Sequence, residues 1–337
     1  MHPPLAHHHY PSLNGWRGIS ILLVLATHLL PLGPKAWHIN LLTGMMGMAI
    51  FFILSGFLIT EFLLQRPDAG AFIVRRFARV LPLFYVYSLI VLWWFAQPPE
   101  NWRAVLLFYA NLPPQRFIPA TAHLWSLCLE VQFYVAMALW CLLTRGRATW
   151  ILVASALAIT AYRIQHQAYA SSVSYFRADE IMAGCILALA LHNKLPDKVK
   201  WLIRDTPWPI TAVLFVASCA EASGPLNYAR PYLAAMLVGY TLLNPGHTLA
   251  KSLSRPWLAY VASISFALYI IHPFLAHTWL GEGDPLTRYL KRPLLFVALW
   301  GLAHLSTFYF EAPLTEWGKR ITRTSPRDLV GRKQPRT

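Results

Sequence analysis

The sequence predicts an all-α protein, a polytopic membrane helix bundle of about ten transmembrane helices with both termini on the cytoplasmic side (N-in/C-in). The first observation is composition: 56% of the 337 residues belong to the set AVILMFWYC and only 13% are charged. A soluble domain has roughly 45–50% apolar and about 25% charged residues. At about 20 residues per spanning helix, this apolar content suffices for roughly nine or ten spans. A separate soluble catalytic domain is not expected, so any chemistry must reside in the helices and their short loops.

The second observation is the order of the apolar runs, which are separated by Pro, Gly or charged residues. Several runs are shorter than about 18 residues, so they must extend into their flanks or lie inside the bundle. A further run at 102–112 suits an extracytoplasmic interfacial helix. The ten expected spans lie near residues 18–32, 41–64, 81–97, 123–143, 149–164, 176–192, 207–222, 229–243, 256–280 and 293–312.

The third observation is the distribution of Lys and Arg over the expected loops. With ten spans and the N-terminus inside, 20 of the 29 basic residues fall on the inner side. This excess follows the positive-inside rule and explains most of the net charge of +15 without nucleic acid as a partner. The expected divisions are a cytoplasmic N-terminal tail (1–17), a membrane domain (18–313) and a basic cytoplasmic tail (314–337). The nine basic residues expected outside are Lys35, Arg103, Arg116, Arg163, Arg177, Arg230, Arg288, Lys291 and Arg292.

No residue pattern indicates a bound metal. The four cysteines stand far apart in apolar stretches without a C-x-x-C pair, so they are expected to pack in the interior. The short cluster His7 to His9 is interpreted as part of a solvated tail.

Arg17 and His28 form the first candidate catalytic pair. They are eleven positions apart in RGISILLVLATH, about three helical turns, so both side chains share one face of a helix. If Arg17 lies at the inner interface, His28 lies near the middle of the bilayer, where desolvation favours the neutral imidazole that a general base requires. The alternative is a histidine bonded to a neighbouring helix and an arginine that only obeys the positive-inside rule.

Arg75, Arg76 and Arg79 form a basic cluster in VRRFARVLP, between the second and third expected spans. Guanidinium groups bind phosphate oxygens in bidentate fashion, so the cluster suits a polyphosphate ligand. Arg75 and Arg79 are one turn apart on one face, with Phe72 and Phe77 available for burial. A contact with lipid headgroups or a simple topology signal explains the cluster equally well.

Two further segments place polar side chains on one face of an apolar helix. In HLWSLCLEVQFY, His123, Ser126 and Glu130 share a face, and Glu130 could orient an imidazole such as His28 or merely tie two helices together. In SISFALYIIHPF, Tyr269 and His272 share a face, and Pro273 is expected to disturb the helix just after the histidine. These segments predict a substrate-facing wall with His123, Ser126, Tyr269 and His272 as weak substrate contacts.

A third polar group lies at the ends of expected spans. Arg177, Asp179 and Glu180 occur together in YFRADE, and Glu311 precedes Pro313 in YFEAPL. We interpret them as mutual ion pairs at helix ends, with contact to a ligand as the alternative.

Taken together, these segments resemble the acyltransferase-3 family of integral membrane acyltransferases. The matching segments are LNGWRGISILLVLATH, FFILSGFLIT, RRFARVLPLF, HLWSLCLEVQFY, SISFALYIIHPF and FYFEAP, in this order. The resemblance implies transfer of an acyl group, usually acetyl, from cytoplasmic acyl-CoA to a hydroxyl of a glycan or lipid-linked glycan at or across the membrane. It places the family's Arg and His motif on Arg17 and His28, and its R-x-x-R element on Arg76 and Arg79.

Two positions depart from the family pattern. Asn14 stands where the family often has Asp, and Val131 stands where a second Glu is frequent, so Glu130 is the only acid of its motif. About 25 residues follow Pro313, so we expect a stand-alone form without the esterase-like domain that some members carry.

The sequence therefore predicts a membrane-bound O-acetyltransferase, with membrane lipids around it and the bacterial inner (plasma) membrane as its location. His28 is expected to be the general base or the acyl carrier, with Glu130 as its partner, and Arg17 is expected to help hold the CoA phosphates at the inner side. Arg75, Arg76 and Arg79 are expected to bind acetyl-CoA or another acyl-CoA. The rival is a proton-coupled transporter or flippase, which also requires buried His and Glu side chains in a bundle.

Overall fold

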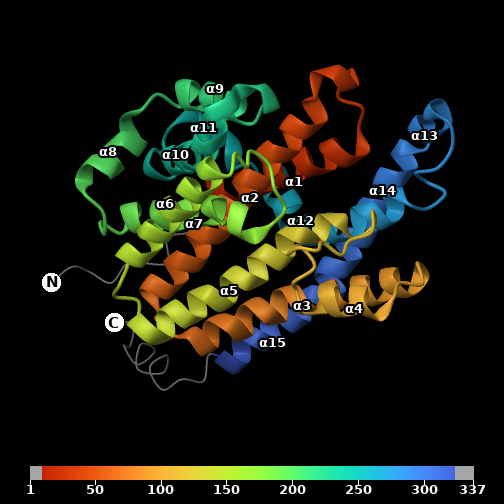
Figure 1. Ribbon diagram of the computed structural model, residues 1–337, viewed down its shortest axis with the longest axis horizontal. Helices are drawn as coiled ribbons and strands as arrows, with labels where there is room; N and C mark the ends of the chain where they lie inside the picture. The colour runs from red at the N-terminus through yellow and green to blue at the C-terminus, as the bar shows by residue number, and fades with distance from the viewer. Residues whose placement is uncertain (1–9, 323–337) are drawn as a thin grey trace, which may run out of the picture. The chain divides into compact units, whose positions relative to one another are not determined.

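The computed structural model describes residues 10–322; His7 to His9 and most of the basic C-terminal tail lie outside the described residues. The described residues form helices and turns without strands, which confirms the predicted all-α class (Figure 1). The chain divides into two compact units: the first is Met1–Glu61 with Thr149–Tyr269, and the second is Phe62–Ala148 with Ile270–Thr337. Helices α2 (Ile39–Gln65) and α12 (Pro256–Ala276) contribute residues to both.

The first unit is built around an apolar core that includes Ile53, Phe57, Leu187, Phe215 and Val238. Besides parts of α2 and α12 it contains α1 (Pro11–Leu29), α6 (Trp150–Gln165), α7 (Ala178–Leu191), α8 (Asp197–Asp205), α9 (Trp208–Ser218), α10 (Arg230–Leu243) and α11 (Thr248–Leu253).

Two glycines bring α2 and α7 into direct backbone contact inside the first unit. A Cβ atom added at Gly56 would lie 1.8 Å from the carbonyl oxygen of Ile181, and one at Gly184 would lie 2.2 Å from that of Ile53. Small residues at a helix crossing are typical of membrane proteins, where close approach replaces hydrophobic association. A side chain at either position would force the two helices apart.

The second unit centres on α3 (Ala69–Trp94), which packs against α5 (Trp125–Thr144) and α15 (Ala312–Thr322). Helix α14 (Arg292–Leu305) continues through a π-helical segment, Ser306–Glu311, into α15. In the π-helical segment the Glu311 carboxylate accepts a hydrogen bond of 2.8 Å from the Ser306 hydroxyl. The remaining helices of this unit are α4 (Pro99–Leu106) and α13 (Pro285–Leu290).

Each of the ten expected spans overlaps a helix, and α4 overlaps the run expected to be interfacial. Among the described residues, five helical segments are long and apolar enough to cross a membrane. The count of ten spans and the N-in/C-in topology stay predictions. The five segments are Ile39–Gln65, Ala69–Trp94, Ala122–Thr144, Pro256–Ala276 and Arg292–Thr322.

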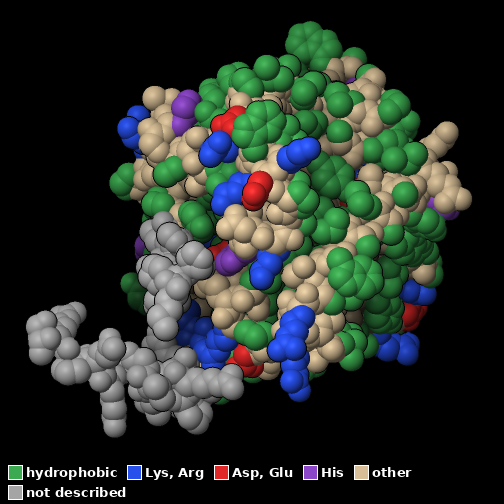
Figure 2. Space-filling model, turned by 90° about the vertical axis from the view of Figure 1, so that its left-hand side faces the viewer, with side chains coloured by type: hydrophobic (Ala, Val, Ile, Leu, Met, Phe, Trp, Pro, Cys, Tyr) green, Lys and Arg blue, Asp and Glu red, His purple; other side chains and the backbone are tan. Residues whose placement is uncertain are grey.

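Many large apolar side chains are exposed, as expected for helices that contact lipid. Trp93 is 72% exposed, Leu143 83% and Tyr309 74%. Hydrophobic side chains are widespread on the face drawn in Figure 2, where Asp and Glu side chains appear at few places. A soluble monomer rarely exposes so much contiguous apolar surface.

Three helix boundaries differ from the sequence expectation. Helix α1 begins at Pro11, before the apolar run, because proline is favoured in the first helical turn. Helix α3 begins at Ala69, since the Asp68 carboxylate accepts a 2.9 Å hydrogen bond from the Ala71 amide and caps it. The expectation of a disturbed helix after His272 is wrong: α12 continues through Pro273 to Ala276, where the proline occupies the last turn.

Candidate functional site

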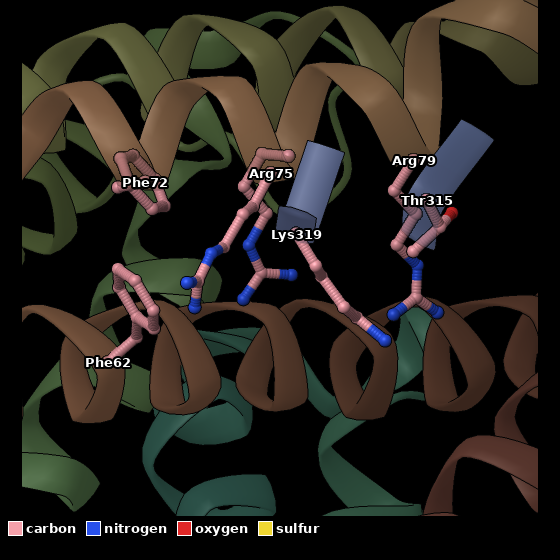
Figure 3. A pocket seen from close by; sticks show the side chains of 7 residues that line it. Phe62, Phe72, Arg75, Arg79, Thr315 and Lys319 are labelled. Carbon is pink, nitrogen blue, oxygen red and sulfur yellow. The ribbon is translucent and has the colours of Figure 1, made fainter. Parts of the chain in front are cut away.

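A basic pocket opens at the N-terminal half of α3, entirely within the second unit. Its volume is about 210 Å³. In Figure 3 the charged ends of Arg75, Lys319 and Arg79 point in the same direction, with Phe62 and Phe72 at the end nearest Arg75. The seven lining residues are Phe62, Phe72, Arg75, Arg76, Arg79, Thr315 and Lys319.

Helix α3 positions the three arginines through its regular geometry. The cap at Asp68 fixes the start of the helix, and Arg75 and Arg79, four residues apart, project from the same face. All three arginines are half-buried, so part of each side chain rests on protein while the guanidinium remains accessible.

Aromatic rings and α15 orient two of the guanidinium groups. Arg75 lies over the ring of Phe62, 5.4 Å from its centroid, and its Nε donates a 2.7 Å hydrogen bond to the Thr322 hydroxyl. Arg76 lies over the ring of Tyr134 at 5.9 Å. Cation–π contacts of this kind hold a guanidinium without neutralising its charge. The arginines are therefore oriented and still positive.

Sequence reasoning missed the contribution of α15, because residues 314–337 were interpreted as a cytoplasmic tail. Lys319 and Thr315 are one turn apart and both line the pocket. Helix α15 reaches α3 because residue 318 is glycine: an added Cβ would lie 2.6 Å from that of Ala78. A glycine on the face of an otherwise amphipathic helix was the signal that could have revealed this contact.

The pocket combines four cationic side chains with no lining carboxylate. Lys319 does form an ion pair of 2.6 Å with Glu316, whose side chain is exposed. A partly desolvated group of like charges is stabilised by a multivalent anion, and guanidinium geometry favours phosphate. The site is therefore chemically suited to a polyphosphate, and the role of Arg75, Arg76 and Arg79 in binding acyl-CoA stays a prediction.

The second unit also brings together two predicted histidines. His123 and His272 are 5% and 0% exposed, and their ring centroids lie 5.4 Å apart. Tyr87 packs edge-on against His123 at 5.6 Å and donates a 2.7 Å hydrogen bond to the Ala120 carbonyl. On α5, Ser126 donates to the His123 carbonyl oxygen at 3.4 Å. Two motifs far apart in sequence thus form one buried aromatic and imidazole cluster.

The other predicted site residues lie in different parts of the two units. Arg17 and His28 are both on α1 of the first unit; Arg17 is half-buried, and His28 is exposed in the last turn. Tyr269, also in the first unit, stacks on Phe51 with ring centroids 6.3 Å apart. Glu130 lies on α5 of the second unit and is 5% exposed. A pairing of His28 with Glu130 stays a prediction.

The first unit contains a buried ion-pair network that the sequence predicted only in part. Glu180 accepts from Arg177 at 3.0 Å and from Arg230 at 2.7 Å, and Asp179 pairs with Arg163. The mutual pairing of Arg177 and Glu180 is confirmed. Arg163 and Arg230 were missed as partners because they were interpreted only as charges of the outer loops.

No group of three His, Cys, Asp or Glu side chains among residues 10–322 could hold a metal ion. The cysteines in this range are unpaired thiols in the interior, which matches their predicted role. They are Cys128, Cys141, Cys185 and Cys219.

The helical fold of residues 10–322, with five apolar helical segments of spanning length, is that of a multi-pass membrane protein. Residues 10–312 match the family described as "Acyltransferase domain", and the chain belongs to this acyltransferase-3 family.

Its curated relatives are O-acetyltransferases by name. The chain is 25% identical to the peptidoglycan O-acetyltransferase OatA of Listeria monocytogenes over 91% of its own length and 56% of the relative's. It is 26% identical to YrhL of Bacillus subtilis, provisionally named a peptidoglycan O-acetyltransferase, over 95% of its length and 57% of the relative's. The chain thus spans about half the length of these relatives. No solved structure matches it.

Proposed function

We propose that this protein is a membrane-bound O-acetyltransferase that moves an acetyl group from cytoplasmic acetyl-CoA to a hydroxyl of a glycan or lipid-linked glycan. The observation that carries the proposal is the pocket with four cations and no lining acid, in a chain of an acyltransferase family. The names of the relatives support a glycan acceptor. The bacterial plasma membrane, ten spans and an N-in/C-in topology belong to the same proposal.

The basic pocket holds the nucleotide end of the donor. Coenzyme A carries a diphosphate and a further ribose phosphate, and each is a bidentate partner for arginine. Arg75, Arg76, Arg79 and Lys319 supply the positive charge, and the half-buried ring of Phe62 supplies an apolar contact for the adenine. The thioester end then extends away from the pocket into the membrane domain.

His28 performs the chemistry in one of two ways. As a general base it takes the proton of the acceptor hydroxyl, the oxygen attacks the thioester carbonyl, the carbon–sulfur bond breaks and the proton goes to the departing thiolate. As an acyl carrier its imidazole nitrogen attacks the thioester carbonyl and the carbon–sulfur bond breaks to release the CoA thiolate; the acceptor oxygen then attacks the acyl carbon, the carbon–nitrogen bond breaks and the hydroxyl proton goes to the thiolate. In either route Glu130 is the partner that orients His28, and Arg17, about three turns away on α1, helps to hold the CoA phosphates.

The test compares acetyl transfer from labelled acetyl-CoA in membranes that contain wild-type protein or His28→Ala at equal abundance. We expect a loss of about 10²–10⁴-fold, the usual contribution of a general base. His166→Ala is the matched control, because His166 is exposed and lies in the same unit. Equal transfer by wild type and His28→Ala would remove His28 from the chemistry. Counterflow of substrate without covalent product would instead identify a transporter.

A further inference from the structure

A second cluster of cations lies at the other end of the continuous helical segment that carries Lys319. It consists of Arg288, Lys291 and Arg292, which we call the outer basic cluster. The segment Arg292–Thr322 has 31 residues, and Arg292 is 27 residues before Lys319, about 40 Å along a helix. This exceeds the hydrocarbon thickness of about 30 Å, so if the segment spans the membrane, as the proposed function requires, the outer basic cluster and the pocket lie at opposite membrane surfaces.

This position runs against the usual distribution of charge. If the pocket faces the cytoplasm, as the proposed function requires, three basic residues within five positions lie on the outer surface. The positive-inside rule disfavours such a group there, so a topological signal does not explain it.

The two arginines are held close together although both are positive. Arg288 and Arg292 are four residues apart, and each guanidinium lies 5.8 Å from the ring centroid of Tyr289. Arg288 belongs to α13 and Arg292 begins α14, and their like charges repel each other across the junction of the two helices. Lys291 adds a third charge and donates hydrogen bonds to the carbonyls of Trp279 (2.8 Å) and Glu282 (3.2 Å).

Several donors of the two arginines are shielded from solvent and form no hydrogen bond within the described residues: Nε of Arg288, and Nε and Nη1 of Arg292. Both side chains are only half-buried, so an anion can reach the rest of each guanidinium. Shielded, unpaired donors of a charged group are costly unless charge is supplied from elsewhere.

The neighbouring carboxylates do not supply that charge. The Asp284 carboxylate accepts from the amides of Leu286 (3.1 Å) and Thr287 (3.3 Å) and caps α13. Glu282 is exposed, and within residues 10–322 neither acid forms an ion pair with an arginine of the outer basic cluster.

We infer that the outer basic cluster binds the phosphate of an anionic lipid headgroup, with Arg288 and Arg292 as the phosphate ligands. A lipid is the source that fits the position, because the cluster begins a helix whose surface is largely exposed: only 17% of the apolar window in Arg292–Thr322 is buried. A phosphate there offsets the repulsion between the two arginines and accepts hydrogen bonds from the guanidinium donors that remain accessible. The outer location rests on the proposed function; binding itself does not.

The experiment counts lipids that remain bound to the purified protein by native mass spectrometry. The full chain is reconstituted in phosphatidylcholine vesicles that contain a minor fraction of phosphatidylglycerol. We expect wild-type protein to retain phosphatidylglycerol, and the double variant Arg288→Gln/Arg292→Gln to retain roughly tenfold less, as expected for the loss of charge-assisted hydrogen bonds. Arg288→Lys/Arg292→Lys keeps the positive charge but loses the planar guanidinium. We expect it to retain an amount of phosphatidylglycerol between those of the wild type and the Gln double variant.

The matched control is Arg103→Gln/Arg116→Gln, which removes the same charge from another part of the second unit. Equal retention by wild type and the Gln double variant would overturn the inference. Displacement of phosphatidylglycerol by excess inorganic phosphate would overturn the lipid source and assign a soluble anion. Acetyl-CoA binding, measured on the same samples, separates this outcome from a failure of the proposed function and verifies that each variant is folded.

Discussion

The two large arginine groups of this chain differ in how deeply the guanidinium groups are buried and in the contacts that hold them. In the first unit, Arg163, Arg177 and Arg230 are 0–2% exposed and are paired with Asp179 and Glu180. In the second unit, the arginines of the pocket are half-buried: Arg75 and Arg76 lie over aromatic rings, and Arg79 interacts electrostatically with Glu130 and Glu311. The same residue type thus serves a closed network in one unit and an open site in the other.

The difference follows from the cost of isolating a charge. A buried guanidinium must have a partner within the protein, because an uncompensated buried charge costs several kcal/mol. A half-exposed guanidinium keeps donors at the surface, where a ligand such as a phosphate can reach them. We therefore assign stability to the network and binding to the pocket, and three variants test this assignment.

The largest expected effect is on stability, from Glu180→Gln. This change removes the carboxylate shared by Arg177 and Arg230 and leaves two buried cations with weaker partners. We expect the free energy of unfolding in detergent to fall by about 3–5 kcal/mol. The control is Glu221→Gln, whose exposed pair with His38 contributes at most about 1 kcal/mol. Unchanged unfolding of Glu180→Gln would mean that the network is not a stabilising element.

The next effect is on donor affinity, from Arg76→Gln combined with Arg79→Gln. Loss of two phosphate partners is expected to weaken acetyl-CoA binding by about 10–100-fold, with little effect on unfolding. The dependence of affinity on salt should also decrease, because fewer charges take part. Binding by isothermal titration at several salt concentrations measures both. If the double variant binds acetyl-CoA as tightly as the wild type does, Arg76 and Arg79 are a topology signal and not ligands of the donor.

The smallest effect concerns α15. Lys319→Gln is expected to weaken acetyl-CoA binding by roughly threefold to tenfold. This effect is smaller than that of the arginines, because an ammonium is a point charge and cannot form the bidentate hydrogen bonds of a guanidinium. Glu316→Gln removes the acid that competes for Lys319 and is expected to raise affinity slightly. Arg320→Gln is the control, since Arg320 is exposed and does not line the pocket. Equal effects of Lys319→Gln and Arg320→Gln would exclude a specific role for Lys319.

The sequence was sufficient to predict the helices and the three arginines of the pocket, because both depend on local patterns. Apolar runs bounded by Pro, Gly or charged residues predict the helices. Arg75, Arg76 and Arg79 are neighbours in sequence and therefore lie on one helix. The partners of Glu180 could not be predicted in the same way. Arg230 is 50 residues away, and only the tertiary arrangement of α7 and α10 brings it to the carboxylate.

Helix α15 illustrates a different limit. Lys319 lies among the basic residues that the sequence assigns to a cytoplasmic tail. The positive-inside rule already explains its charge, so nothing in the sequence indicates that it lines a pocket. Its contact with α3 depends on Gly318 and on the close approach of two helices 240 residues apart in sequence (78 to 318). Composition cannot distinguish a charge in a tail from one in a site.

The π-helical segment Ser306–Glu311 determines which face of α15 meets the pocket. A π-helical turn is in effect an α-helix with one inserted residue, so every position after it is rotated by about 100°. Deleting a single residue there would restore a regular α-helix and turn Thr315 and Lys319 away from Arg75 and Arg79. The contribution of α15 to the pocket thus depends on the number of residues in the π-helical segment. A deletion there can abolish it without replacing any residue that lines the pocket.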